Sequence, residues 1–328
     1  MRRRDFGWLV ASLPLILSQA GRAQQARGDA RPLAVGFVTM LDEASATDFL
    51  ATLRAGLAAY GYSGPRLVLE TRYAAQAPER IAGFVSELDK RGVDVIVTHA
   101  AATPLVVAAP RSKPVVYQLS ADPVTVGLSR DLVHPDNNAT GVTLMMAELN
   151  AKRLDLAREI QPGLKRIAVL VNPLHGGAAL ERKVVETKAQ QLGIEPLFEE
   201  VATQAALERA LASVPARQPD AILMFADAFV VSNQKGIAEF AIRNRLPVYS
   251  GWAVMAEAGA FCTYGPKLKE AFRRMAFFVD KIAQGKTPAE LPIEQPSEFE
   301  LVVNLATARQ IGVNVPPQIL ARADRVVE

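Results

Sequence analysis

The sequence predicts an α/β protein with two similar Rossmann-like lobes, each built on a parallel sheet and joined to the other by a hinge. Short apolar runs rich in β-branched residues alternate with helix-length segments, a pattern typical of parallel sheets. The same order of runs also occurs twice, with corresponding runs roughly 130 residues apart, about the length of one small domain.

The strands of each copy follow in order along the chain. In the first copy we expect strands at 33–38, 67–70, 93–97 and 114–117. In the second copy we expect them at 167–171, 196–199, 221–225 and 246–249. The carboxyl ends of parallel strands meet at one edge of a sheet, so two such lobes face each other across a cleft that suits a small molecule.

The amino-terminal residues have the features of a signal peptide. Three arginines precede an apolar stretch at 8–17, and Gly21-Arg22-Ala23 resembles a cleavage site. The apolar stretch is too short for a bilayer, which needs about 20 residues. We expect residues 1–23 to be removed near Ala23. Arg3-Arg4-Asp5-Phe6 resembles a twin-arginine motif, although an ordinary secretory signal remains the alternative.

Composition excludes some classes of partner. The formal net charge of +3 belongs to the amino-terminal segment, because its four arginines and single aspartate account for all of it. The rest of the chain is formally neutral and gives no reason to expect binding to nucleic acid. The single cysteine, Cys262, cannot form an internal disulfide, and its apolar surroundings indicate a buried residue. No cysteine near Ala23 could carry a lipid, so we do not expect a lipoprotein.

Motifs of the common α/β enzymes are missing from the sequence. There is no G-x-G-x-x-G before a helix, no P-loop and no G-x-S-x-G after a strand. His99, His134 and His175 lack the spacing of metal ligands, so neither a metal nor a cofactor is expected. His134 and His175 are expected to be surface or satisfied residues. The one candidate acid–base pair is Asp122 with His99.

Polar and small residues follow the expected strands, where ligands of parallel sheets bind. The candidates at strand ends are Thr39, His99, Ala101, Thr103, Ser120, Asn172, Asp227 and Trp252. Each has an ordinary structural alternative: Asn172-Pro173 is a common turn, and Asp227 could cap the following helix. Their repeated position after strands is the stronger argument for a shared ligand site.

Several longer segments then resemble a known family. They are Asp122-Pro-Val-x-x-Gly-Leu128, Asn138-Ala-Thr-Gly-Val142, Glu148-Leu-x-Ala-Lys-Arg-Leu154, Ile167-Ala-Val-Leu-Val-Asn-Pro173, Glu257-Ala-Gly259, Thr263-Tyr-Gly-Pro266, Pro296-x-x-Phe-Glu-Leu-Val-Val-Asn-Leu305 and Val315-Pro-Pro-x-x-Leu-Ala-Arg-Ala-Asp324. Together they resemble the substrate-binding proteins of ABC transporters, in the branch that includes tryptophan- and phenylalanine-binding proteins.

The resemblance implies a type I periplasmic-binding fold in which the chain crosses between the lobes more than once. Lobe one is then expected to contain 31–141 and about 266–290. Lobe two is expected to contain 142–265 and about 291–328. A helix near 268–284 belongs to lobe one, and Gly141 is the candidate hinge because glycine tolerates backbone rotation.

The resemblance also implies a function. The chain is expected to be a monomeric solute-binding component of an ABC importer in the periplasm, without catalysis. It would close on a small organic ligand and present it to an inner-membrane permease with its ATPase. For an aromatic or branched-chain amino acid, Thr39, Ser120 and the helix start at 100–103 would hold the carboxylate and Asp227 the ammonium. Trp252, Tyr264 or Phe229 would contact the side chain, and Asp122 is the rival partner for the ammonium.

Two other functions fit a two-lobed cleft. A binding protein that docks onto a membrane signalling receptor would have the same cleft and the same closure. A periplasmic enzyme would need the Asp122–His99 pair to act within the cleft. Sequence reasoning leaves both alternatives open.

Overall fold

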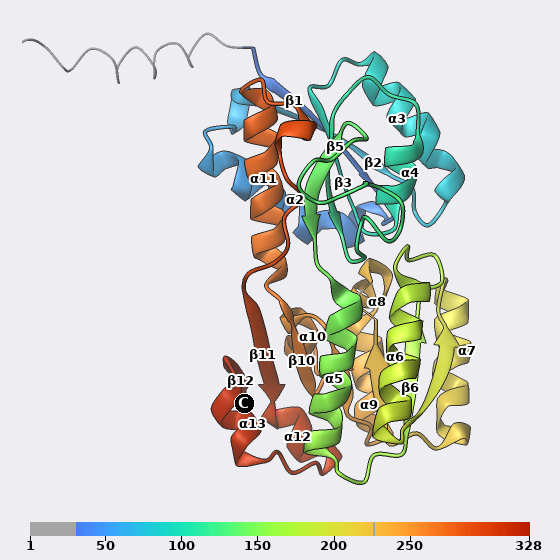
Figure 1. Ribbon diagram of the computed structural model, residues 1–328. Helices are drawn as coiled ribbons and strands as arrows, with labels where there is room; N and C mark the ends of the chain where they lie inside the picture. Colours follow the sequence, from blue (N-terminus) through green and yellow to red (C-terminus); the bar gives the residue numbers. More distant parts are fainter. Residues whose placement is uncertain (1–30, 226) are drawn as a thin grey trace, which may run out of the picture. The chain divides into compact units, whose positions relative to one another are not determined.

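The computed structural model describes residues 31–225 and 227–328, so the predicted signal peptide lies outside the described residues. Two sheets of mainly parallel strands alternate with helices (Figure 1), which confirms the predicted fold class. Within the described ranges, no helix is both long and apolar enough to cross a bilayer.

The first sheet is entirely parallel and has the strand order β2-β1-β3-β4-β5. Its strands are β1 Leu33–Thr39, β2 Leu67–Tyr73, β3 Val95–His99, β4 Val115–Leu119 and β5 Ala139–Thr143. Its helices are α2 Glu43–Ala59, α3 Ile81–Lys90, α4 Ala102–Ala108 and, from much later in the chain, α11 Leu268–Ala283. We call this sheet and its helices lobe one.

The second sheet has the order β12-β11-β10-β9-β8-β6-β7 and is parallel except where β10 pairs with β11. Its strands are β6 Arg166–Val171, β7 Glu195–Glu200, β8 Ala221–Met224, β9 Val248–Ser250, β10 Cys262–Pro266, β11 Phe299–Asn304 and β12 Arg325–Val327. Its helices are α5 Met146–Ile160, α6 Ala178–Leu192, α7 Gln204–Ser213, α8 Ala228–Ser232, α9 Gln234–Arg243, α10 Ala253–Glu257, α12 Leu305–Ile311 and α13 Pro317–Arg322. We call this group lobe two. Short 3-10 turns at Gly64–Arg66, Pro78–Arg80, Val214–Arg217 and Pro288–Glu290 complete the chain.

Helices cover both faces of each sheet, as buried parallel strands require. In lobe one, Val35 and Phe37 belong to the core that includes α2 and α11. Val38, which follows Phe37 and points to the opposite face of β1, belongs to the core that includes α3 and α4. Successive side chains of a strand point to opposite faces, so a continuous apolar run supplies two cores at once. The amphipathic helix expected at 268–284 is therefore a core helix, and its Phe272 and Phe278 are buried.

The chain passes between the two lobes three times. The first passage lies between β5 and α5, and the second lies between β10 and α11. The third follows Glu294, which bridges to Val142 of β5 before β11 begins. In this bridge the Thr143 N–H donates to the Glu294 carbonyl at 2.9 Å, and the Glu294 N–H donates to the Gly141 carbonyl at 2.9 Å. The three passages lie together because the third one extends the sheet beside β5.

Gly141 lies within β5 with a φ of +156°. A Cβ at this position would lie 1.9 Å from the Tyr117 carbonyl oxygen of β4, far inside van der Waals contact. The structure thus gives a local packing reason for this glycine, and its role as a hinge stays a prediction.

We expect Gly141→Ala to lower the free energy of unfolding by about 3 kcal/mol or more, because β4 and β5 must separate to admit the methyl group. Gly83→Ala is the matched control: Gly83 lies inside α3 with open space at its Cβ position, so alanine should stabilise the helix by about 0.5–1 kcal/mol. Urea unfolding of both variants measures the difference. Equal stability of Gly141→Ala and the parent protein would contradict the close approach.

Candidate functional site

A small cavity lies at the carboxyl ends of strands from both lobes. Lobe one lines it with Thr39, Met40, Leu41, Gln76, His99, Ala100 and Ala101, and lobe two with Asn172, Asp227 and Phe229. Five of the residues predicted from strand ends thus meet in one place. The cavity volume is about 10 Å³, on the order of a single water molecule.

On the lobe one side, His99 is fixed by a hydrogen bond and by aromatic rings. Its Nε2 lies 2.9 Å from Thr39 Oγ1, which also accepts from the Leu41 N–H at 3.1 Å. The rings of Phe37, Phe49 and Phe272 surround the imidazole, with centroids 5.6, 4.9 and 5.6 Å away. Burial lowers the pKa of His99 to about 4, so the ring is neutral at neutral pH.

On the lobe two side, Asp227 both caps a helix and faces the cavity. Its Oδ1 accepts from the Phe229 and Val230 N–H groups at 2.8 and 3.4 Å, which satisfies the start of α8. The same oxygen accepts from Asn172 Nδ2 at 3.0 Å, and Asn172 Oδ1 accepts from the Leu174 N–H at 3.0 Å. Within the described residues, Asp227 Oδ2 makes no hydrogen bond. One oxygen therefore holds the loop and the other remains available.

Gln76 is a cavity residue that sequence reasoning missed. It follows β2 in a turn where Ala75 and Gln76 have φ of 51° and 63°, and its N–H donates to the Met40 carbonyl at 2.7 Å. This turn carries the partly exposed Gln76 to the end of β1, at the cavity. The sequence signal that could have identified Gln76 was its position shortly after β2, because polar residues that follow the other strands of lobe one were already candidates.

Three predicted residues lie elsewhere in the two cores. Thr103 is buried and its hydroxyl donates to the Gln118 carbonyl at 3.3 Å. Ser120 is buried, and its carbonyl accepts from the Met146 N–H at 2.9 Å at the first passage between the lobes. Trp252 is the residue before α10; its Nε1 is buried with no hydrogen-bond partner among the described residues. These three are not among the residues that line the small cavity.

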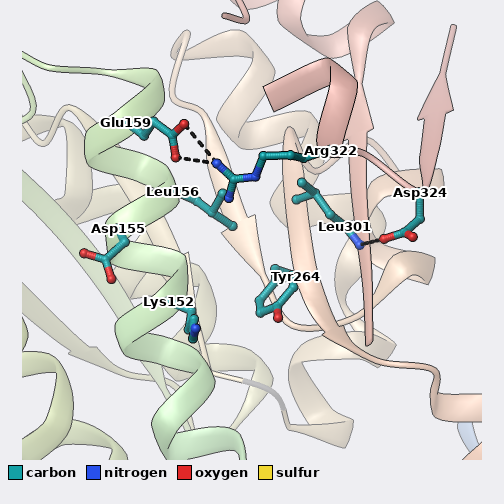
Figure 2. Close-up of a pocket in the computed structure, with 8 residues that line it drawn as sticks. All are labelled: Lys152, Asp155, Leu156, Glu159, Tyr264, Leu301, Arg322 and Asp324. Carbon is teal, nitrogen blue, oxygen red and sulfur yellow. Dashed lines mark hydrogen bonds and ion pairs between the residues drawn. The ribbon is translucent and has the colours of Figure 1, made fainter. Parts of the chain in front are cut away.

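Tyr264 lines a different and larger cavity of about 500 Å³ (Figure 2). Lys152, Asp155, Leu156 and Glu159 of α5 form one wall, and Tyr264, Leu301, Arg322 and Asp324 form the other. Arg322 Nη1 donates to both oxygens of Glu159 at 3.0 Å across it. All of these residues belong to lobe two, so closure of one lobe on the other would not enclose a ligand here.

Asp122, the other half of the candidate acid–base pair, lies in a turn. Its Oδ1 accepts from the Val124 N–H at 3.0 Å and its Oδ2 from Thr125 Oγ1 at 2.7 Å. In the described part of the chain it makes no hydrogen bond with His99. No group of three or more His, Cys, Asp or Glu side chains in the described ranges is arranged to hold a metal ion.

The depressed pKa of His99 predicts a loss of stability in mild acid. The unfolded chain takes up a proton on this residue near pH 6.5, whereas the folded chain does so only near pH 4. Stability should therefore fall as the pH drops from 7 to 5, by about 2 kcal/mol. We expect His99→Gln to reduce this dependence in urea unfolding at pH 7 and pH 5. An unchanged dependence would show that other groups cause the loss.

One of the comparisons with known proteins identifies a family. The family model described as ABC transporter substrate binding protein matches residues 34–327. A search of curated protein sequences gives no match.

Solved structures resemble the chain over most of its length. A conserved domain protein from Vibrio cholerae has 25% sequence identity and a TM-score of 0.83, with 90% of this chain and 100% of that chain covered. An ABC domain in complex with L-Trp from Streptococcus pneumonia has 20% identity and a TM-score of 0.81, with the same coverage.

A third structure is the 5-methylthioribose transporter solute binding protein from Thermotoga lettingae, in complex with 5-methylthioribose. It has 16% identity and a TM-score of 0.63, with 89% of this chain and 97% of that chain covered. These likenesses support the type I periplasmic-binding fold. Since the family model spans almost all of the described residues, the chain belongs to the ABC transporter substrate-binding protein family.

Proposed function

We propose that this chain is the extracytoplasmic solute-binding component of an ABC importer, and that it binds a small organic ligand between its lobes without catalysing a reaction on it. The observation that carries this proposal is the cavity lined by strand ends of both lobes, in a chain of the substrate-binding family. Residues 1–23 would direct export to the periplasm, and the mature protein would act as a monomer that delivers its ligand to a membrane permease.

The size of the cavity supports a mechanism of opening and closure. A volume of about 10 Å³ cannot admit an organic molecule, so the strand ends must move apart before a ligand enters. A ligand that contacts both lobes then favours the closed arrangement, because only that arrangement makes both sets of contacts. A micromolar ligand contributes about 8 kcal/mol, enough to overcome an opening preference of a few kcal/mol.

The chemistry of the cavity favours an amino acid with an apolar side chain. Asp227 Oδ2 is a free carboxylate oxygen that would bind an ammonium group, and the Gln76 amide would donate to a carboxylate. Met40, Leu41 and Phe229 offer apolar contact for the side chain. An aromatic or branched-chain amino acid fits this set, and the L-Trp complex of the Streptococcus pneumonia protein makes L-tryptophan the first candidate.

A thermal-shift screen of residues 24–328 against amino acids, small carboxylates, purines and sugars tests the proposal. A ligand at 100 times its Kd stabilises the protein by about 2.7 kcal/mol, which raises the Tm by several degrees. We expect a shift with aromatic or branched-chain amino acids. A shift with sugars alone would contradict the amino-acid chemistry, and turnover of the ligand would contradict the binding role.

We expect Asp227→Asn to weaken binding of the responding amino acid by about 100-fold, because the amide keeps the helix cap but loses the charge that faces the ammonium. Asp122→Asn is the control, since this rival carboxylate already accepts two hydrogen bonds within its own turn. Isothermal titration calorimetry measures both affinities, and thermal melts check that both variants fold. Equal losses in the two variants would contradict the assignment of Asp227.

A further inference from the structure

Four buried polar side chains form a chain of contacts inside lobe two. Arg153 Nη1 donates to Asn150 Oδ1, and Asn150 Nδ2 donates to Glu181 Oε2 at 2.7 Å. The other oxygen of Glu181 lies 2.7 Å from Nε2 of His175. All four side chains are buried, with exposed fractions of 3% or less. We call Arg153, Asn150, Glu181 and His175 the buried relay.

Arg153 is held in this interior with few partners. Its Nε donates to the Tyr264 carbonyl at 2.8 Å, and its Nη2 reaches only the sulfur of Met146, at 3.8 Å. It makes no ion pair with a described residue, and burial lowers its pKa to about 10. A charge buried in this way costs free energy that a buried apolar side chain would not cost. The presence of Arg153 at this position therefore indicates a role beyond packing.

Two glycines make the space that the guanidinium occupies. A Cβ on Gly251 would lie 2.6 Å from Arg153 Nη2, and a Cβ on Gly265 would lie 1.9 Å from the Gly251 carbonyl oxygen. Gly265 is next to the end of β10, and Met146 is the first residue of α5. The Arg153 end of the relay therefore lies at two of the three passages between the lobes.

The His175 end lies in the loop 172–177, which contacts lobe one. A Cβ on Gly177 would lie 2.9 Å from the Cβ of Ala121, and a Cβ on Gly176 would lie 3.4 Å from Cγ of Pro104. The same loop carries Asn172, which holds Asp227 at the cavity. The relay thus connects the passages between the lobes with the loop that meets lobe one beside the ligand cavity.

We propose that Arg153 is a positioning residue: acting through Asn150 and Glu181, it holds His175 and the loop 172–177 in the conformation that contacts lobe one, and so favours closure. This role depends on the proposed function in one respect: the event that Arg153 would control is the closure of the lobes. The contacts of the buried relay join residues of the chain itself, so the role can be tested without knowing the ligand.

The charges around His175 make closure sensitive to pH. They are Glu181 of α6, Asp227 before α8 and, behind Glu181, Arg153 of α5; the lobe one residues that the loop contacts are Pro104 and Ala121. Burial lowers the pKa of His175, but the hydrogen bond and charge of Glu181 together with Asp227 outweigh burial and raise it. The groups that raise this pKa all belong to lobe two and stay with His175, whereas lobe one adds only burial. When the loop leaves lobe one, the pKa of His175 should therefore rise further, so closure releases a proton.

The experiment measures lobe separation in the ligand-free protein by pulsed EPR between spin labels at Lys90→Cys of α3 and Glu186→Cys of α6, both exposed positions. Cys262 is buried and remains in place. We expect Arg153→Met to raise the ratio of open to closed protein about tenfold, a typical size for coupling between sites. Arg322→Met is the matched control, because Arg322 also binds α5, through Glu159, but lies outside the buried relay.

A pH series distinguishes a positioning role of the buried relay from a general loss of rigidity in the variants. In the parent protein the closed fraction should fall as the pH falls from about 8 to about 6.5, and Glu181→Gln, which keeps the shape of the side chain, should abolish this fall. If Arg153→Met does not fold, Arg153→Lys and Glu181→Gln decide the question, and both should open the lobes. A folded Arg153 or Glu181 variant with the parent distance distribution would overturn the proposal, as would an equal change in Arg322→Met. Failure of L-tryptophan to bind would contradict the ligand assignment alone.

Discussion

The parallel arrangement of the strands is the constraint on which the rest of the molecule depends. A parallel sheet ends all its strands at one edge, and each strand must be buried on both faces by helices that return the chain to the other edge. The polar loops of each lobe are therefore gathered at a single edge, where Thr39 and His99 meet in one lobe and Asn172 and Asp227 in the other. The position of the small cavity follows from this geometry, and the loop residues set its chemistry.

In the proposed closure of the lobes, some parts of the chain would stay rigid and others would move. Within lobe one the glycine at 141 allows β5 to lie against β4 with no space for a side chain. The three passages between the lobes are short and lie side by side, and Arg274 of α11 binds Glu294 there through two hydrogen bonds. In the proposed closure, movement would be confined to these few residues between the lobes.

The sequence predicted where the strands end, but it did not predict the direction of every side chain near those ends. All eight predicted strands exist, and their carboxyl ends carry Thr39, His99, Asn172 and Asp227 to the cavity because the position of a strand end follows from periodicity. Tyr264, within a strand that pairs with the antiparallel β11, lines the larger cavity beside α5, and its contact with a ligand stays a prediction. Gln76 was missed because Ala75 and Gln76 adopt the left-handed backbone conformation in its turn. A glycine at either position would have indicated the turn in the sequence.

Asp227 shows why a structural and a functional interpretation of one residue need not compete. As an N-cap it accepts from α8 with Oδ1, and that bond together with the Asn172 amide fixes the carboxylate plane. A side chain locked in this way loses little further conformational freedom when its second oxygen binds an ammonium group, so less of the binding free energy is spent on ordering it. In the proposed site, the helix cap would thus position Asp227 for contact with the ligand. The same logic extends to Asn172, whose loop also carries His175 of the buried relay. In the proposed site, the residues that face the ligand would be held by contacts outside the cavity.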